Sequence, residues 1–80
     1  MGAKKISQIK APMQAVVYAL GVAVGDQVSA GQEVAVLEAM KMHYEIIAEV
    51  DGTVEEVTAV AGNQVAADDV LIEIQQEEAH

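Results

Sequence analysis

A chain of 80 residues has room for one small domain with a thin core, which leaves little space for a walled catalytic pocket. Its 13 acidic and 4 basic residues give a formal net charge of −9, and such a negative field argues against nucleic-acid binding. The absence of cysteine excludes disulfides, thiolate chemistry and Cys-based zinc sites. Because no apolar run could span a bilayer and no signal-peptide pattern opens the chain, we expect a cytoplasmic protein without membrane insertion.

Short segments rich in Val and Ile alternate with turn signals along the chain. In chain order, the turn signals are Gly25-Asp26, Ala30-Gly31, Asp51-Gly52 and Gly62-Asn63. Val34–Glu38 and Met42–Val50 are expected to be strands, because Val packs well on a pleated sheet and every second residue from Met42 to Val50 is apolar. Ile47 is the exception to this alternation.

The chain also repeats itself at an interval of 37 residues, since Ile9–Glu38 can be laid over Ile46–Gln75. The identical pairs are Ile9/Ile46, Ala11/Ala48, Val17/Val54, Gly25/Gly62, Gln27/Gln64, Val28/Val65 and Ala30/Ala67. A duplicated half-domain with pseudo-twofold packing explains this pattern. The matched Val28 and Val65 are therefore expected in the core.

A helix competes with the strands in the middle of the chain. Glu33 to Val50 contains no Gly or Pro, and its apolar residues also fit a helical stripe. The repeat favours strands, because Ile46–Val50 overlays Ile9–Met13 and Pro12 suits a strand start or edge better than a helix interior. We therefore predict an all-β fold of two small antiparallel sheets, packed as a flattened barrel or sandwich over residues 9–75, with flexible termini at 1–8 and 76–80.

The candidate functional residue lies at the link between the two copies. If the flanking segments are strands, Met40-Lys41-Met42 forms a hairpin with Lys41 near its tip. A hairpin tip holds its side chain away from the body of the domain, where another enzyme could reach an acyl-accepting amine. Met40 and Met42 are expected to contribute little to the core.

Glu38-Ala39-Met40-Lys41-Met42 resembles the attachment motif of the biotinyl domains of biotin-dependent carboxylases and decarboxylases, which have a barrel-sandwich hybrid fold. The resemblance covers residues 9–75. Its further motifs are Ala11-Pro12-Met13, Gly25-Asp26-x-Val28, Gly31, Asp51-Gly52 and Leu71-Ile72-x-Ile74.

This resemblance implies a carrier with no catalytic residue and no metal site of its own. A biotin protein ligase would join biotin to Lys41, a biotin carboxylase would load CO2 to give carboxybiotin, and a carboxyltransferase would pass the carboxyl group to an acceptor that the sequence leaves open. The carrier contributes a tether that raises local concentration. Met40 and Met42 would present the arm, Ala39 completes the motif, and Glu38 would assist recognition by the ligase.

The chain departs from the family pattern in its first half. The family commonly has Pro-Gly where this chain has Gln14-Ala15, and if that position needs a positive φ, Ala15 is strained by about 1 kcal/mol or more. Asp68 stands where the first copy has Gly31. The 37-residue register closes without a gap, so the chain resembles carriers that lack the extra thumb loop.

Two other functions remain as alternatives, a lipoyl carrier and a structural module of another class. A lipoyl domain shares the fold and the hairpin lysine, but it usually has Asp-Lys-Ala around that lysine. An unmodified structural barrel-sandwich module lacks the motif lysine. His43 is interpreted as a solvated strand residue rather than a catalytic one, and the acidic surface as either a solvated surface or a docking face for basic partners.

Overall fold

The computed structural model describes residues 5–76, which form eight β-strands. The strands are β1 (Ile6–Lys10), β2 (Ala15–Leu20), β3 (Gln27–Val28), β4 (Glu33–Ala39), β5 (Met42–Ile47), β6 (Gly52–Val57), β7 (Gln64–Val65) and β8 (Val70–Gln76). These 72 residues include no helix capable of crossing a membrane. The all-β prediction is confirmed.

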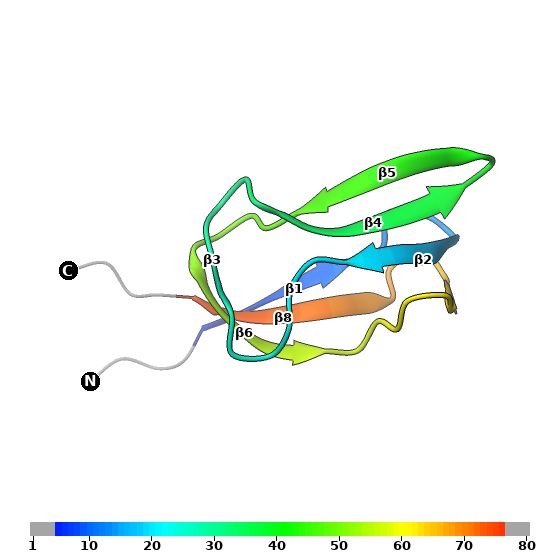
Figure 1. Ribbon diagram of the computed structural model, residues 1–80. Helices are drawn as coiled ribbons and strands as arrows, with labels where there is room; N and C mark the ends of the chain where they lie inside the picture. Colours follow the sequence, from blue (N-terminus) through cyan, green and yellow to red (C-terminus); the bar gives the residue numbers. More distant parts are fainter. Residues whose placement is uncertain (1–4, 77–80) are drawn as a thin grey trace, which may run out of the picture.

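The strands form two four-stranded antiparallel sheets that lie face to face (Figure 1). One sheet has the order β1-β8-β6-β3, and the other has the order β5-β4-β2-β7. The predicted repeat maps β1–β4 onto β5–β8, so each sheet takes two strands from each copy. Both sheets therefore combine strands of the two copies in an equivalent way, and the predicted pseudo-twofold sandwich is confirmed.

The glycine turns tie the copies together through reciprocal hydrogen bonds. The Gly25 N–H donates to the Val54 carbonyl at 2.9 Å, and the Val54 N–H donates back to the Asp26 carbonyl at 2.8 Å. The second copy repeats the arrangement, since Gly62 donates to Val17 at 2.7 Å and Val17 donates to the carbonyl of residue 63 at 2.9 Å. Gly25 and Gly62 have φ of 95° and 93°, a conformation that only glycine adopts freely.

The core lies between the sheets and is built mainly from repeat pairs. Its largest fully buried side chains are Leu37, Leu71, Ile72, Ile74, Val17, Val34 and Val54. Each such side chain stabilises the fold by about 1.5–3 kcal/mol through apolar burial. Because equivalent residues of both copies meet in this core, one copy alone would leave its inward face uncovered.

Glu33 to Val50 is a hairpin and not a helix. β4 and β5 pair antiparallel from Glu33↔Ile47 to Ala39↔Met42. The strand is shorter than predicted, because β5 ends at Ile47 although the apolar alternation continues to Val50. Ala48 still exchanges backbone hydrogen bonds with the loop at residues 31–32, and the chain then bends toward the other sheet.

Two further details differ from the sequence expectations. Residues 6–8 and 76, assigned there to the termini, lie in the paired strands β1 and β8; residues 1–4 and 77–80 lie outside the described part. Val28 is buried, at 4% exposure, but Val65 is only half-buried. On the Val28 side, Asp51 Oδ1 accepts a 2.7 Å hydrogen bond from the Ala30 backbone and holds the adjacent loop, whereas an exposed Gln14 stands at the position equivalent to Asp51.

Gly52 and Ala15 occupy equivalent positions, but only Gly52 must be a glycine. Neither has a positive φ, so the strain considered for Ala15 does not arise. A Cβ on Gly52 would overlap the carbonyl oxygen of Gln75 and lie 2.8 Å from Ile74 Cγ2. The glycine is therefore needed for the close approach of β6 to β8 and not for its backbone dihedral angles.

Gly52→Ala is expected to lower the free energy of unfolding by about 2–3 kcal/mol, because the backbone of β8 must move to admit the methyl group. Gly21→Ala is the matched control: it also has no positive φ, and its new Cβ would meet nothing closer than Val34 O at 3.6 Å. The control should change stability by less than about 0.5 kcal/mol. Urea unfolding midpoints measure both, and equal midpoints would contradict the close approach.

Candidate functional site

Lys41 lies in the two-residue turn that joins β4 to β5, as the sequence predicts. Ala39 and Met42 are the last paired residues, and Met40 and Lys41 between them have φ of 52° and 63°. Two consecutive positive φ angles are the pattern of a type I′ hairpin turn, which usually holds Asn and Gly. Two long side chains in this conformation carry a steric cost of about 1–2 kcal/mol each.

The turn projects from one end of the sandwich, and its side chains are exposed. Lys41 is exposed, Met40 is 91% exposed and Met42 is 58% exposed. β1 begins and β8 ends at the opposite end of the molecule (Figure 1). The Tyr44 hydroxyl donates to Met42 Sδ at 3.9 Å, which places this methionine on the inward-facing side of the hairpin. Both methionines therefore lie outside the core, as expected.

The base of the hairpin carries a second group of polar and aromatic side chains. Glu38 and His43 are directly opposite on β4 and β5, and Glu38 Oε2 is 3.9 Å from His43 Nε2. The Tyr18 ring, from β2, stacks on His43 with centroids 4.3 Å apart and planes inclined by 34°. Sequence reasoning missed Tyr18, because no spacing in the sequence brings residues 18 and 43 together. Glu38 and Ala39 are half-buried.

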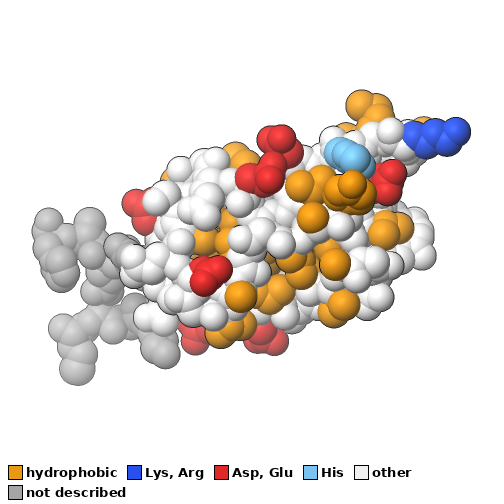
Figure 2. All heavy atoms as spheres, in the orientation of Figure 1, with side chains coloured by type: hydrophobic (Ala, Val, Ile, Leu, Met, Phe, Trp, Pro, Cys, Tyr) orange, Lys and Arg blue, Asp and Glu red, His pale blue; other side chains and the backbone are white. Residues whose placement is uncertain are grey.

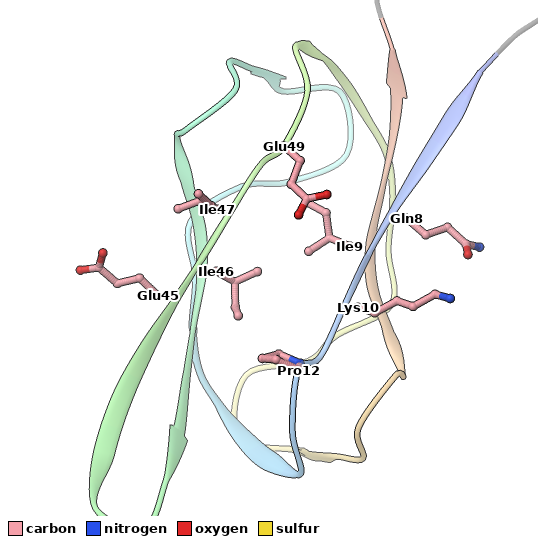
Figure 3. Close-up of a pocket in the computed structure, with 8 residues that line it drawn as sticks. All are labelled: Gln8, Ile9, Lys10, Pro12, Glu45, Ile46, Ile47 and Glu49. Carbon is pink, nitrogen blue, oxygen red and sulfur yellow. The ribbon is translucent and has the colours of Figure 1, made fainter.

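A groove with a volume of about 500 Å3 lies away from the lysine, between the edge strands β1 and β5. Figure 3 shows the eight residues that line it: Gln8, Ile9, Lys10, Pro12, Glu45, Ile46, Ile47 and Glu49. Ile46 points into the groove, whereas Gln8 and Lys10 point away from it (Figure 3). Charged residues on both edge strands oppose pairing of these edges with another chain.

Residues 5–76 thus form a two-sheet sandwich with an exposed lysine on a strained hairpin tip, opposite the ends of the described chain. Comparison with known proteins gives the family: residues 7–74 match the Biotin_lipoyl family, described as "Biotin-requiring enzyme". The chain belongs to this family of biotin/lipoyl attachment domains.

Two relatives show how the domain is used in longer and shorter chains. The α chain of mitochondrial propionyl-CoA carboxylase from Homo sapiens is 44% identical over 69 residues, which cover 86% of this chain and 10% of that protein. A biotin/lipoyl attachment protein from Bacillus subtilis is 50% identical over 50 residues, which cover 62% of this chain and 68% of that protein. This chain thus spans about a tenth of the carboxylase chain that it matches.

Solved structures share the fold. Urea carboxylase from Kluyveromyces lactis matches 92% of this chain, with 6% of its own length, at a TM-score of 0.82 and 27% identity. The lipoyl domain of the 2-oxoglutarate dehydrogenase complex from Azotobacter vinelandii matches 89% of this chain and 98% of its own, at a TM-score of 0.77 and 23% identity. The second likeness concerns the fold alone.

Lys41→Gly is expected to stabilise the domain by about 0.5–1 kcal/mol, because glycine removes the cost of a positive φ but adds disorder to the unfolded chain. Lys10→Gly, within β1 and without a positive φ, should instead lower stability by about 0.5–1 kcal/mol. Denaturant midpoints of the two variants test this. A loss of stability in both would show that the turn is not strained.

Proposed function

We propose that Lys41 is the covalent attachment point of biotin and that the domain carries the carboxyl group between the active sites of a biotin-dependent carboxylase. The single observation that carries this proposal is the position of Lys41 at an exposed turn in which two bulky residues are held at positive φ. Natural proteins retain such strain at functional sites, where the geometry is required.

The residues at the tip fit a covalently attached biotin. The Lys41 side chain is exposed and is free to act as a nucleophile toward an activated acyl group. Amide formation joins Nζ to the biotin carbonyl carbon, releases the adenylate leaving group and transfers the amine proton to solvent or to the ligase. When bound, biotin supplies the carboxyl-carrying chemistry, and the protein supplies a firm hairpin that presents it.

Biotin is favoured over lipoate by two independent features. Exposed methionines flank Lys41, and a flexible, polarizable thioether suits transient contact with several partner surfaces. The second feature is the propionyl-CoA carboxylase relative, which is 44% identical to this chain over 69 residues. An unmodified structural module has no need of a strained tip with a lysine.

The partners that we propose follow from the function. A biotin protein ligase modifies Lys41, and a biotin carboxylase and a carboxyltransferase then use the loaded arm. We propose an acyl-CoA carboxylase as the assembly, since the propionyl-CoA carboxylases are 41–44% identical to this chain, slightly more than the 38–41% of the pyruvate carboxylases. Tethering makes each encounter with these active sites effectively intramolecular.

Incubation with a biotin protein ligase, biotin and ATP is expected to label Lys41 alone. Lys10 is exposed but lies in β1, where it offers no hairpin tip, so Lys10→Arg should be labelled as the wild type is, while Lys41→Arg should not be labelled. Peptide mass spectrometry locates the adduct. Biotin on another lysine, or lipoate on Lys41 after incubation with a lipoate ligase in its place, would refute the proposal.

Substitutions of the flanking methionines should separate loading from folding. Met40→Ala or Met42→Ala is expected to change stability by less than about 0.5 kcal/mol, as at exposed sites generally, yet to slow loading or carboxyl transfer. Val28→Ala is the opposite case, because a buried side chain is shortened; it should cost about 1–3 kcal/mol. The same change at the half-buried Val65 should cost less. Denaturant midpoints and ligase rates measure both properties, and unfolding caused by a methionine variant would show that its side chain belongs to the core.

A further inference from the structure

The outward faces of the two sheets are equivalent in the repeat but differ in their chemistry. Besides Glu38, the larger outward residues on β2 and β4, the central strands of the sheet that carries the hairpin, are apolar: Val16, Tyr18 and Val36. Their repeat equivalents on the other sheet are polar: Thr53, Glu55 and Glu73. The buried core lies between the two sheets, so neither outward face is needed to form it. Folding therefore does not explain why one face is apolar.

The apolar face is continuous with the attachment site. Val16 on β2 is opposite Glu38 on β4, and Glu38 is opposite His43 on β5. These three neighbouring residues form a row across the outward face, and Glu38 and His43 are the last outward pair before the turn. Tyr18, 57% exposed, stacks on His43 at 4.3 Å. We name Val16, Tyr18, Val36 and His43 the hairpin-sheet patch. Figure 2 shows hydrophobic side chains gathered beside the histidine and near the projecting hairpin.

We propose that the hairpin-sheet patch is the docking surface for the biotin protein ligase that acts on Lys41; this proposal rests on the function proposed above. Exposed tyrosine is enriched at the energetic centres of protein interfaces. The carboxylates of Glu38 and Glu45 lie on the outward side of β4 and β5 around the patch. The matching ligase surface is apolar at its centre and basic at its rim.

The reach of an unmodified lysine favours the ligase over the carboxylase as the occupant. An extended lysine carries Nζ only about 6 Å from its Cα, by ordinary bond lengths. His43 is two residues along β5, about 7 Å from the turn at the rise of a strand. An enzyme that brings an activated acyl group to Nζ must therefore cover the hairpin closely, and a stable interface of about 800 Å2 per partner extends beyond His43 to Tyr18. Biotin lengthens the arm, so later partners need not approach the base of the hairpin.

The repeat supplies the variant that tests this proposal. Val16→Thr combined with Tyr18→Glu gives each position the residue of its equivalent on the other sheet, where both are compatible with the fold. Gln27→Glu adds the same charge at an exposed position of β3, on the other sheet, and serves as the matched control. Circular dichroism and urea midpoints establish folding, and Tyr18→Ser provides a neutral second variant.

Steady-state kinetics of loading by the ligase should show a KM for the double variant raised about tenfold or more, with little change in kcat. The control should stay within about twofold of the wild type. If the wild type itself is not loaded at Lys41, the proposed function fails. If the wild type is loaded and the folded patch variants show the same KM, only the docking proposal is overturned. Normal loading followed by slow carboxyl transfer would assign the patch to the carboxylase and would also overturn docking of the ligase.

Discussion

Each copy of the repeat closes its glycine turn on a strand of the other copy. The N–H groups of Gly25 and Gly62 donate to Val54 and Val17, and those same two residues donate back to the turns. Val54 and Val17 are also fully buried, so the residues that hold the turns are the residues that fill the core. The exchange of strands, the two sheets and the projection of the β4–β5 hairpin all depend on this reciprocal contact, because it fixes where each copy leaves one sheet and enters the other.

The places where the copies differ show which demands are local. Gly31 has φ of 90° and its equivalent Asp68 has φ of 72°, so the turn conformation was kept although the residue changed. Aspartate tolerates this region better than most residues, since its short polar side chain can bond locally. Gly52 differs from Ala15 for another reason, namely the carbonyl of Gln75 beside it. The position of Gly31 and Asp68 requires a positive φ, whereas the position of Gly52 lacks room for a Cβ. Each of the two positions is a glycine in only one of the two copies.

Much of the fold could be predicted from the repeat, because matched copies are expected to share a structure and Pro12 suits a strand start or edge better than a helix interior. The hairpin at Lys41 followed from the same reasoning. The strand order could not be predicted, since nothing in the spacing shows that each sheet mixes both copies. Tyr18 escaped for a related reason: its contact with His43 arises only when β2, β4 and β5 are neighbours. The Asp51–Ala30 hydrogen bond beside Val28, which exposed Gln14 does not repeat beside Val65, also joins residues that the spacing does not bring together. The alternation of apolar residues continues to Val50, but a bend ends the strand at Ile47.

The lysine and the ends of the described chain lie at opposite ends of the sandwich (Figure 1). A pull on the tip against an anchor at the far end therefore acts along the strands, and β4 and β5 are loaded together. The load passes to the rest of the structure as shear across the β4–β2 ladder and the core, where many hydrogen bonds and apolar contacts resist at the same time. A force applied across the strands would open the pairs one after another. The placement of the tip thus sets the direction in which the domain resists a pull on Lys41, along its strands rather than across them.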